Sequence, residues 1–195
     1  MMSMVNGMVE PMLGDRFERA LVMAHRLHRL QVRKGSPVPY VAHLMSVAAL
    51  VLEDGGDEDE AIAALLHDAM EDQGLTREAL RAEFGDRVCA IVEGCTESVV
   101  VPKLPWRERK VAHLAKVLGA TESVRRVTMA DKLHNVRSLL ADYERFGPGL
   151  WGRFGGRKAG TVWYYREIVN RLRDGEPEGM VRLLLVNVEL LEQLV

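Results

Sequence analysis

The stretch Ile62-Ala-Ala-Leu-Leu-His-Asp-Ala-Met-Glu-Asp-Gln-Gly74 joins an apolar run to four ionisable residues, His67, Asp68, Glu71 and Asp72. On a helix these side chains are three or four residues apart, so they gather along one edge. They are expected at the C-terminal end of the helix, which carries a partial negative charge and is therefore an unfavourable place for three carboxylates. A bound divalent cation would remove this conflict, and a solvated helix end is the common alternative for such a segment.

The residues on either side of this stretch repeat at the helical period. From Asp15 to Val32, apolar residues recur at intervals of three and four, which predicts a helix. Further helices are expected over 40–53, 57–70, 76–85, from 86 onward, 106–118, 121–145, 159–173 and 178–194. No alternating strand pattern and no internal repeat accompanies them, so we predict an all-α fold.

Two stretches lack this helical pattern. Segment 96–105 contains prolines at 102 and 105 and is expected to be a loop, since its three consecutive valines have no evident partner strand. Segment 147–160 is rich in glycine and carries Arg153, Arg157 and Lys158. We expect a mobile basic loop there, and loops of this length are often functional.

Length and composition are those of an ordinary globular protein. A chain of 195 residues with 48% hydrophobic and 28% charged residues is expected to form one domain. We place that domain at 12–195 and interpret 1–11 as a flexible N-terminal lead-in. The lead-in lacks a basic segment followed by an apolar one, and no run reaches the roughly 18–20 apolar residues that span a bilayer. Neither a signal peptide nor a membrane segment is expected.

The net charge and the cysteine content limit the expected binding partners and the expected cellular compartment. The net charge of −2 provides no overall basic character, so nucleic acid is not an expected partner. Cys89 and Cys95 lack the C-x-x-C spacing of redox and zinc motifs, which favours a reducing cytoplasm. The apolar C-terminal helix is expected to pack on the core, and the oligomeric state stays open.

Two further segments carry polar residues on otherwise apolar helices. His43 opens the helix at 40–53, where a capping or core histidine would be the simpler interpretation if it stood alone. Asp131 lies inside the helix at 121–145, where a surface pair within that helix is the simpler interpretation. Together with His67 and Asp68, these residues form a set of two histidines and two aspartates that could hold a cation.

The order of this set resembles the H…HD…D signature of HD-domain metal-dependent phosphohydrolases. Leu66-His-Asp-Ala-Met-Glu-Asp72 is similar to the HDxxED variant of the RelA/SpoT-type alarmone hydrolases. Arg33-Lys34 with Pro39-Tyr-Val-Ala-His43 is similar to their RKxxGxPYxxHP segment, and Ala130-Asp-Lys-Leu-His-Asn135 is similar to their ADKLxN segment. These motifs occur in the family's order, and the resemblance covers roughly residues 15–170.

The resemblance implies a fold and a metal site. The fold would be a compact helical HD bundle, and the metal ligands would be His43, His67, Asp68 and Asp131. In this family the metal is typically Mn²⁺. Imidazole and carboxylate ligands suit such an ion and leave iron and zinc open.

The resemblance also implies roles for polar residues around that metal. Glu71 and Asp72 would activate or position the attacking water. The substrate-binding residues that it implies are Arg33 and Lys34 beside the purine base, Asn135 near the ribose, and Lys103, Arg157 and Lys158 at phosphates.

We therefore expect a small, stand-alone Mn²⁺-dependent enzyme that removes the 3′-diphosphate from a (p)ppGpp- or (p)ppApp-type alarmone. The products would be pyrophosphate and a nucleoside 5′-di- or triphosphate. Two alternatives stay open, an HD hydrolase that acts on another nucleotide phosphate ester and a nucleotide-binding HD protein without turnover. The loop at 35–39 departs from the family pattern, so the sequence does not decide between guanine and adenine.

Overall fold

The computed structural model describes residues 4–5, 8–9, 13–97, 104–173 and 178–194. Helices make up most of this part of the chain, which confirms the all-α prediction. The helices are α1 (Asp15–His28), α2 (Val41–Glu53), α3 (Glu58–Leu66), α4 (Ala69–Gln73), α5 (Arg77–Cys95), α6 (Trp106–Leu118), α7 (Glu122–Phe146), the 3₁₀-helix η1 (Gly147–Arg153), α8 (Arg157–Leu172) and α9 (Gly179–Gln193). Two short antiparallel strands, β1 (Met4–Val5) and β2 (Met8–Val9), lie in the expected lead-in.

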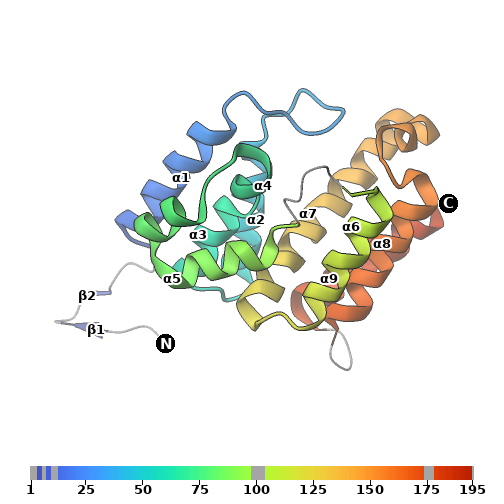
Figure 1. Cartoon of the computed structure of the whole chain (residues 1–195). Helices are drawn as coiled ribbons and strands as arrows, with labels where there is room; N and C mark the ends of the chain where they lie inside the picture. The colour runs from blue at the N-terminus through green and yellow to red at the C-terminus, as the bar shows by residue number, and fades with distance from the viewer. Residues whose placement is uncertain (1–3, 6–7, 10–12, 98–103, 174–177, 195) are drawn as a thin grey trace.

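Helix α7 lies in the middle of the molecule, with α1 to α5 on one side and α6, α8 and α9 on the other (Figure 1). Buried apolar side chains from both groups meet α7 in one hydrophobic core. Within the described residues, no helix combines the length and the apolar character needed to cross a membrane. This arrangement places the polar side chains of α7 between the two groups of helices.

Helix α3 is the most deeply buried helix, and its start follows from local sequence. Asp57 accepts a hydrogen bond from the backbone N–H of Glu60, and the Glu60 carboxylate accepts one from the backbone N–H of Asp57. This capping box satisfies two backbone donors that a helix start would otherwise leave open. Every residue of 60–66 is buried, so the helix ends with its side chains packed on the core.

The predicted helix 57–70 is interrupted at the ionisable residues. Helix α3 ends at Leu66, His67 and Asp68 form a turn, and α4 begins at Ala69. Asp68 has φ −97° and ψ −4°, values typical of the third residue of a type I turn. The expectation of one continuous helix edge was therefore wrong, because a turn rather than a helix presents His67 and Asp68.

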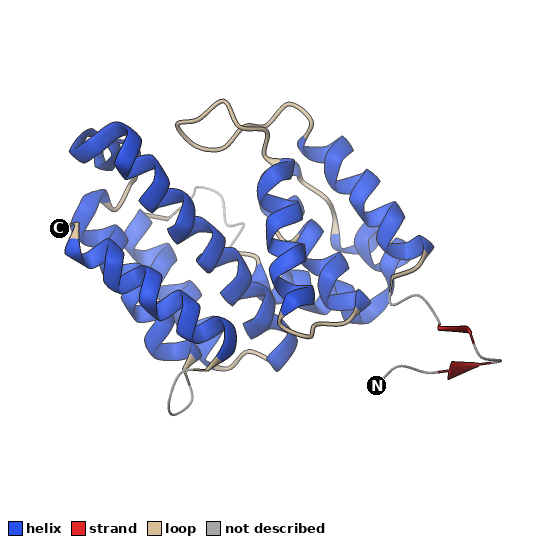
Figure 2. Ribbon diagram, turned by 180° about the vertical axis from the view of Figure 1, so that it is seen from behind, coloured by secondary structure: helices blue, strands red, loops and turns tan. Residues whose placement is uncertain are grey.

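The connection between α1 and α2 is a structured loop, seen at the top of Figure 2. The predicted helix from Asp15 stops at His28, before the end expected at Val32. The Arg33 backbone N–H donates to the Val38 carbonyl at 2.8 Å, and the Arg153 guanidinium donates to the Gly35 carbonyl at 2.8 Å. Gly35 has φ +77°, and a Cβ there would lie 2.8 Å from the Arg153 side chain, so this contact requires glycine.

Two predictions about helix breaks had opposite outcomes. The predicted boundary at Gly85 is confirmed, because Gly85 has φ +88° and kinks α5 there. The predicted mobile loop at 147–160 is wrong. It forms η1 and the first turn of α8, since Leu150 and Trp151 are buried and anchor the segment to the core. In the predicted loop at 96–105, residues 98–103 lie outside the described residues.

Candidate metal centre and substrate pocket

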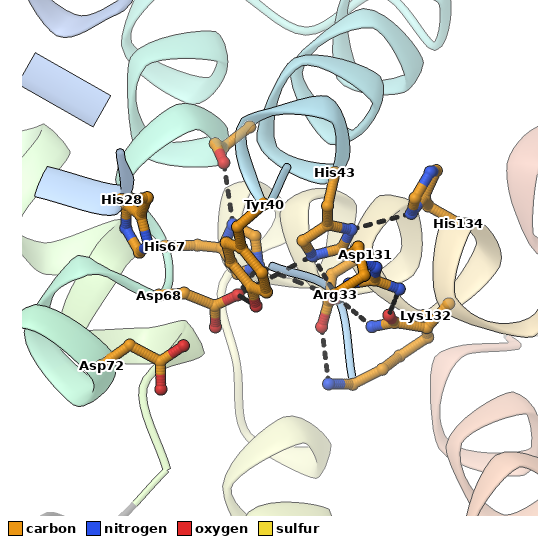
Figure 3. Close-up of polar contacts among 12 residues, drawn as sticks. His28, Arg33, Tyr40, His43, His67, Asp68, Asp72, Asp131, Lys132 and His134 are labelled. Carbon is orange, nitrogen blue, oxygen red and sulfur yellow. Dashed lines mark hydrogen bonds and ion pairs between the residues drawn. The ribbon is translucent and has the colours of Figure 1, made fainter. Parts of the chain in front are cut away.

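The four predicted metal ligands come together from three parts of the fold (Figure 3). His43 lies in the first turn of α2, His67 and Asp68 form the turn after α3, and Asp131 lies within α7. The His43 Nε2 atom lies 3.3 Å from Asp131 Oδ1, and the His67 Nε2 atom lies 3.0 Å from Asp68 Oδ2. The two cross distances, His43 Nε2 to Asp68 Oδ2 and His67 Nε2 to Asp131 Oδ1, are both 3.7 Å.

The bonding of the two histidines fits a cation ligand. The Nε2 atoms of His43 and His67 are buried and have no hydrogen-bond partner. His67 donates from Nδ1 to the Ala64 carbonyl at 2.8 Å, which holds its ring in the orientation that aims Nε2 at the carboxylates. Buried polar atoms are rarely left unsatisfied, so two such nitrogens beside two carboxylate oxygens fit a divalent cation.

The charges around this cluster also favour a cation. Burial opposes the charged form of Asp131, but Lys132 and the two histidines outweigh burial and hold the pKa of that carboxyl well below its usual range. Burial likewise opposes the imidazolium form of His67, and the negative charges of Asp68 and Asp131 outweigh it and raise the pKa of His67 well above its usual range. The carboxylates therefore attract positive charge, and a divalent cation would compete with the His67 proton.

Several contacts orient the two aspartates. The Tyr40 hydroxyl donates to Asp68 Oδ2 at 2.5 Å, and the Lys132 ammonium lies 2.6 Å from Asp131 Oδ2. The Asn135 amide donates to Asp131 Oδ1.

On the far side of the cluster, the Nδ1 atoms of His43 and His134 lie 2.8 Å apart. Burial, followed by the positive charges of neighbouring groups, lowers the pKa of His134 to about 4.

Glu71 and Asp72 lie on α4 beside the cluster and line a cavity of about 200 Å³ that also contains His67, Asp68 and Asp131. Asp72 Oδ2 accepts a hydrogen bond of 2.7 Å from the Gln31 amide. Partial enclosure raises the pKa of Asp72; the hydrogen bond from Gln31 opposes this rise, and the negative charges of Asp68 and Glu71 add to it. The structure therefore brings both predicted water-activating carboxylates to the predicted metal ligands.

The contacts that hold Asp72 were not expected from the sequence. The Gln31 side-chain oxygen accepts hydrogen bonds of 2.6 Å from both Gln73 and the Nδ1 atom of His28. His28 is buried and stacks on Tyr40, with ring centroids 5.2 Å apart. No motif contains these residues, so no signal in the sequence marks this network.

A second cavity, of about 730 Å³, shares part of its lining with the small one and is lined by the predicted nucleotide-binding residues Arg33, Lys34 and Asn135. The Arg33 guanidinium donates to the Asn135 side-chain oxygen at 2.7 Å and lies 5.7 Å from the Tyr40 ring centre. Lys34 lies 5.4 Å from the Phe154 ring centre. Six residues line both cavities: Tyr40, Asp72, Arg109, Lys110, Lys132 and Asn135.

The cations of α6 on this shared wall were missed by the sequence analysis. Arg109 donates to a Glu97 carboxylate oxygen at 2.8 Å, and Lys110 forms an ion pair with the same carboxylate. Their side chains are 18% and 17% exposed, so they are enclosed, unlike the cations of an ordinary solvated helix face. A basic stretch on a predicted helix does not reveal this, because the sequence does not show which face the other helices cover.

Two of the three remaining predicted phosphate-binding residues, Arg157 and Lys158, do not line the pocket. Arg157 is exposed at the start of α8 with φ +51°, and neither it nor Lys158 lines the two cavities. Lys103 lies outside the described residues. The cations that do face the pocket come instead from the α1–α2 loop, from α6 and from α7.

Comparison with known proteins agrees with this geometry. The HD domain family matches residues 20–159. A Mus musculus protein named guanosine-3′,5′-bis(diphosphate) 3′-pyrophosphohydrolase MESH1 is 36% identical over 125 residues, covering 63% of this chain and 68% of that protein. An Aquifex aeolicus guanosine-3′,5′-bis(diphosphate) 3′-pyrophosphohydrolase is 35% identical over 132 residues, covering 66% of this chain and 18% of that protein.

The chain thus spans less than a fifth of the long bacterial relatives, at 18%, 16% and 16% of their lengths. It also superimposes on a solved structure described as a metazoan ortholog of SpoT that hydrolyzes ppGpp. That superposition has a TM-score of 0.78 at 27% identity and covers 93% of this chain and 98% of that one. The chain belongs to the HD domain family, in the RelA/SpoT-type branch that includes the small MESH1 proteins.

Proposed function

We propose that this protein is a metal-dependent hydrolase that removes the 3′-diphosphate from a (p)ppGpp- or (p)ppApp-type alarmone. One observation carries the proposal. The cluster of two histidines and two aspartates borders the cavity of about 200 Å³, and that cavity shares a wall, which carries Arg109, Lys110 and Lys132, with a nucleotide-sized cavity of about 730 Å³. Relatives of this chain are named for the same reaction on guanosine-3′,5′-bis(diphosphate).

The metal in this proposal is Mn²⁺, held by His43, His67, Asp68 and Asp131. Carboxylate oxygens suit a hard ion such as Mn²⁺, and imidazole nitrogens also bind divalent first-row metal ions. When bound, such an ion lowers the pKa of a water and offsets the charge of the phosphate that is attacked. The two buried Nε2 atoms without partners support the ligand assignment.

The substrate would lie along the two joined cavities. Its 3′-diphosphate would face the cluster, where Lys132 and Lys110 line both cavities and can balance phosphate charge. Arg33 lines the larger cavity above the ring of Tyr40, which lines both cavities, so the Arg33 guanidinium plane can stack on the purine. Asn135, which bonds both Arg33 and Asp131, would lie beside the ribose and link the base site to the cluster.

Glu71 and Asp72 would position the attacking water and accept its proton. Gln31 holds one Asp72 oxygen, which leaves the other to accept a hydrogen bond from the water. A bond forms between the water oxygen and the 3′-bound phosphorus, and the bond from that phosphorus to the 3′ oxygen breaks. The accepted proton then passes to the 3′ oxygen, so the products are pyrophosphate and a nucleoside 5′-di- or triphosphate with a free 3′-hydroxyl.

We also propose that residues 12–195 form a single domain that acts in the cytoplasm on a small-molecule nucleotide and not on nucleic acid. The single hydrophobic core supports the domain assignment. The two free cysteines, Cys89 and Cys95, fit a reducing compartment.

The test is pyrophosphate release from ppGpp and from ppApp, each with Mn²⁺ and with excess chelator. Wild type is expected to turn over at least one of them with Mn²⁺ only, and Asp68→Ala is expected to lose the activity. Asp15→Ala, at an exposed aspartate of α1, serves as the matched control and should retain it. A wild type that is silent on both substrates would leave hydrolysis of another phosphate ester, or nucleotide binding without turnover, as the function.

A further inference from the structure

The two histidines of the metal centre are held in different ways. His67 donates from Nδ1 to the Ala64 backbone carbonyl at 2.8 Å. His43 has no such backbone partner; its Nδ1 lies 2.8 Å from the Nδ1 of His134, a residue 91 positions later in the chain. One histidine is therefore held by its own helix and the other by a side chain from α7.

Two ring nitrogens at this distance share one proton, because one must donate and the other must accept. The Nε2 atom of His43 is buried, has no hydrogen-bond partner and lies 3.3 Å from Asp131 Oδ1. If Nε2 binds a cation, its lone pair is used there, and the ring proton must lie on Nδ1. His43 then donates to His134, and His134 must carry its own proton on Nε2.

We propose that His134 is a positioning residue for the metal centre: its Nδ1 accepts the Nδ1 proton of His43 and so aims His43 Nε2 at the cation. His134 itself does not ligate, because its bonded nitrogen contacts the side of His43 that faces away from the carboxylates (Figure 3). The rings lie 4.8 Å apart and are tilted by 45°, so the contact is an edge hydrogen bond and not a stack.

The burial of His43 gives this contact its weight. His43 is 1% exposed, so water cannot replace a lost acceptor without opening the core around α2 and α7. An Nδ1–H without an acceptor would also favour the other tautomer, with the proton on Nε2, and that tautomer cannot ligate through Nε2, the nitrogen that faces the carboxylates. Loss of such an outer hydrogen bond typically weakens metal binding by about 10–100-fold.

The experiment titrates Mn²⁺ by calorimetry into the full-length, chelator-stripped protein in the absence of nucleotide. The leucine of His134→Leu has no hydrogen-bond acceptor, so the Mn²⁺ dissociation constant is expected to rise by about 10–100-fold. His134→Asn places its Oδ1 where Nδ1 was and is expected to restore affinity close to wild type. His25→Leu, at an exposed histidine of α1, is the matched control and should not change affinity.

Unchanged affinity in His134→Leu, or an equal loss in His134→Leu and His134→Asn, would overturn the proposal. Thermal unfolding of the metal-free variants separates misfolding from loss of the site. Should His134→Leu not fold, a long-range ¹H–¹⁵N NMR spectrum of the Zn²⁺-loaded wild type decides the matter, since a proton on Nδ1 of His134 contradicts the assigned acceptor. The inference rests on the metal site of the proposed function and not on its substrate, so lack of activity on alarmones would not affect this test.

Discussion

Replacing His113 by glutamine is expected to reduce the pH dependence of stability. His113 lies on α6, is 4% exposed, and has its Nδ1 atom 3.1 Å from the Tyr164 hydroxyl. Burial, followed by the positive charge of Lys132, lowers the pKa of His113 from 6.5 to about 3. Folding therefore holds this ring in its neutral form, with Nδ1 hydrogen-bonded to the Tyr164 hydroxyl.

The magnitude follows from the two pKa values. In the unfolded chain His113 binds a proton below about 6.5, whereas in the folded protein it stays neutral down to about 3. As the pH falls, His113 therefore binds a proton in the unfolded state before it does so in the folded state. The free energy of unfolding that is present above pH 6.5 is progressively lost between about pH 6.5 and about pH 3. At about pH 5 this one residue removes about 2 kcal/mol of unfolding free energy relative to about pH 7.5.

The assay is urea denaturation of wild type and His113→Gln at these two pH values. Glutamine keeps an acceptor for Tyr164 but does not titrate, so the variant should lose about 2 kcal/mol less than wild type on acidification. His25→Gln, at an exposed histidine of α1, should lose as much as wild type. Equal losses in wild type and His113→Gln would refute the reasoning, because His113 would then titrate alike in both states.

Three further perturbations test the pocket and the core. Lys110→Gln should raise the alarmone KM by about tenfold in steady-state kinetics with little change in Mn²⁺ affinity, because Lys110 lines both cavities without contacting a proposed ligand; an unchanged KM would remove it from phosphate binding. Arg126→Met should lower the unfolding free energy in urea by about 3–5 kcal/mol, because it leaves buried Glu60 without the ion pair at 2.7 Å; a loss below about 1 kcal/mol would contradict this. Asp142→Asn should lower the kcat/KM for ppGpp relative to that for ppApp by about tenfold. Asp142 lines the larger cavity, and its carboxylate can accept hydrogen bonds from both N–H groups on the guanine edge. An unchanged ratio of the two kcat/KM values would exclude a role of Asp142 in base choice.

Local signals predicted most of the helices, because caps, glycines and apolar periodicity act over a few residues. Asp57 with Glu60 forms the capping box that starts α3, and Gly85 kinks α5 at its predicted boundary. The turn at His67 and Asp68 was not predicted, since the apolar period continues through it. The segment 147–160 was misjudged for a related reason, because burial of Leu150 and Trp151 in the hydrophobic core overrides its high glycine content.

The candidate site likewise has residues that the sequence predicted and residues that it did not. The order of His43, His67, Asp68 and Asp131 along the chain was enough to predict the set, because the family resemblance supplied the pairing that spacing alone leaves open. Lys110 could not be predicted, because a cation on an amphipathic helix resembles a solvated one until Tyr164 of α8 and Glu97 enclose it.

By itself, the sequence determined that this chain is helical and which residues could hold a metal, since residue type and local periodicity decide both. Only the tertiary structure decided which groups surround those residues. The Gln31 amide on Asp72 and the His134 ring on His43 join segments 41 and 91 residues apart. Such contacts depend on how helices pack, and packing is set by the whole core rather than by any one segment.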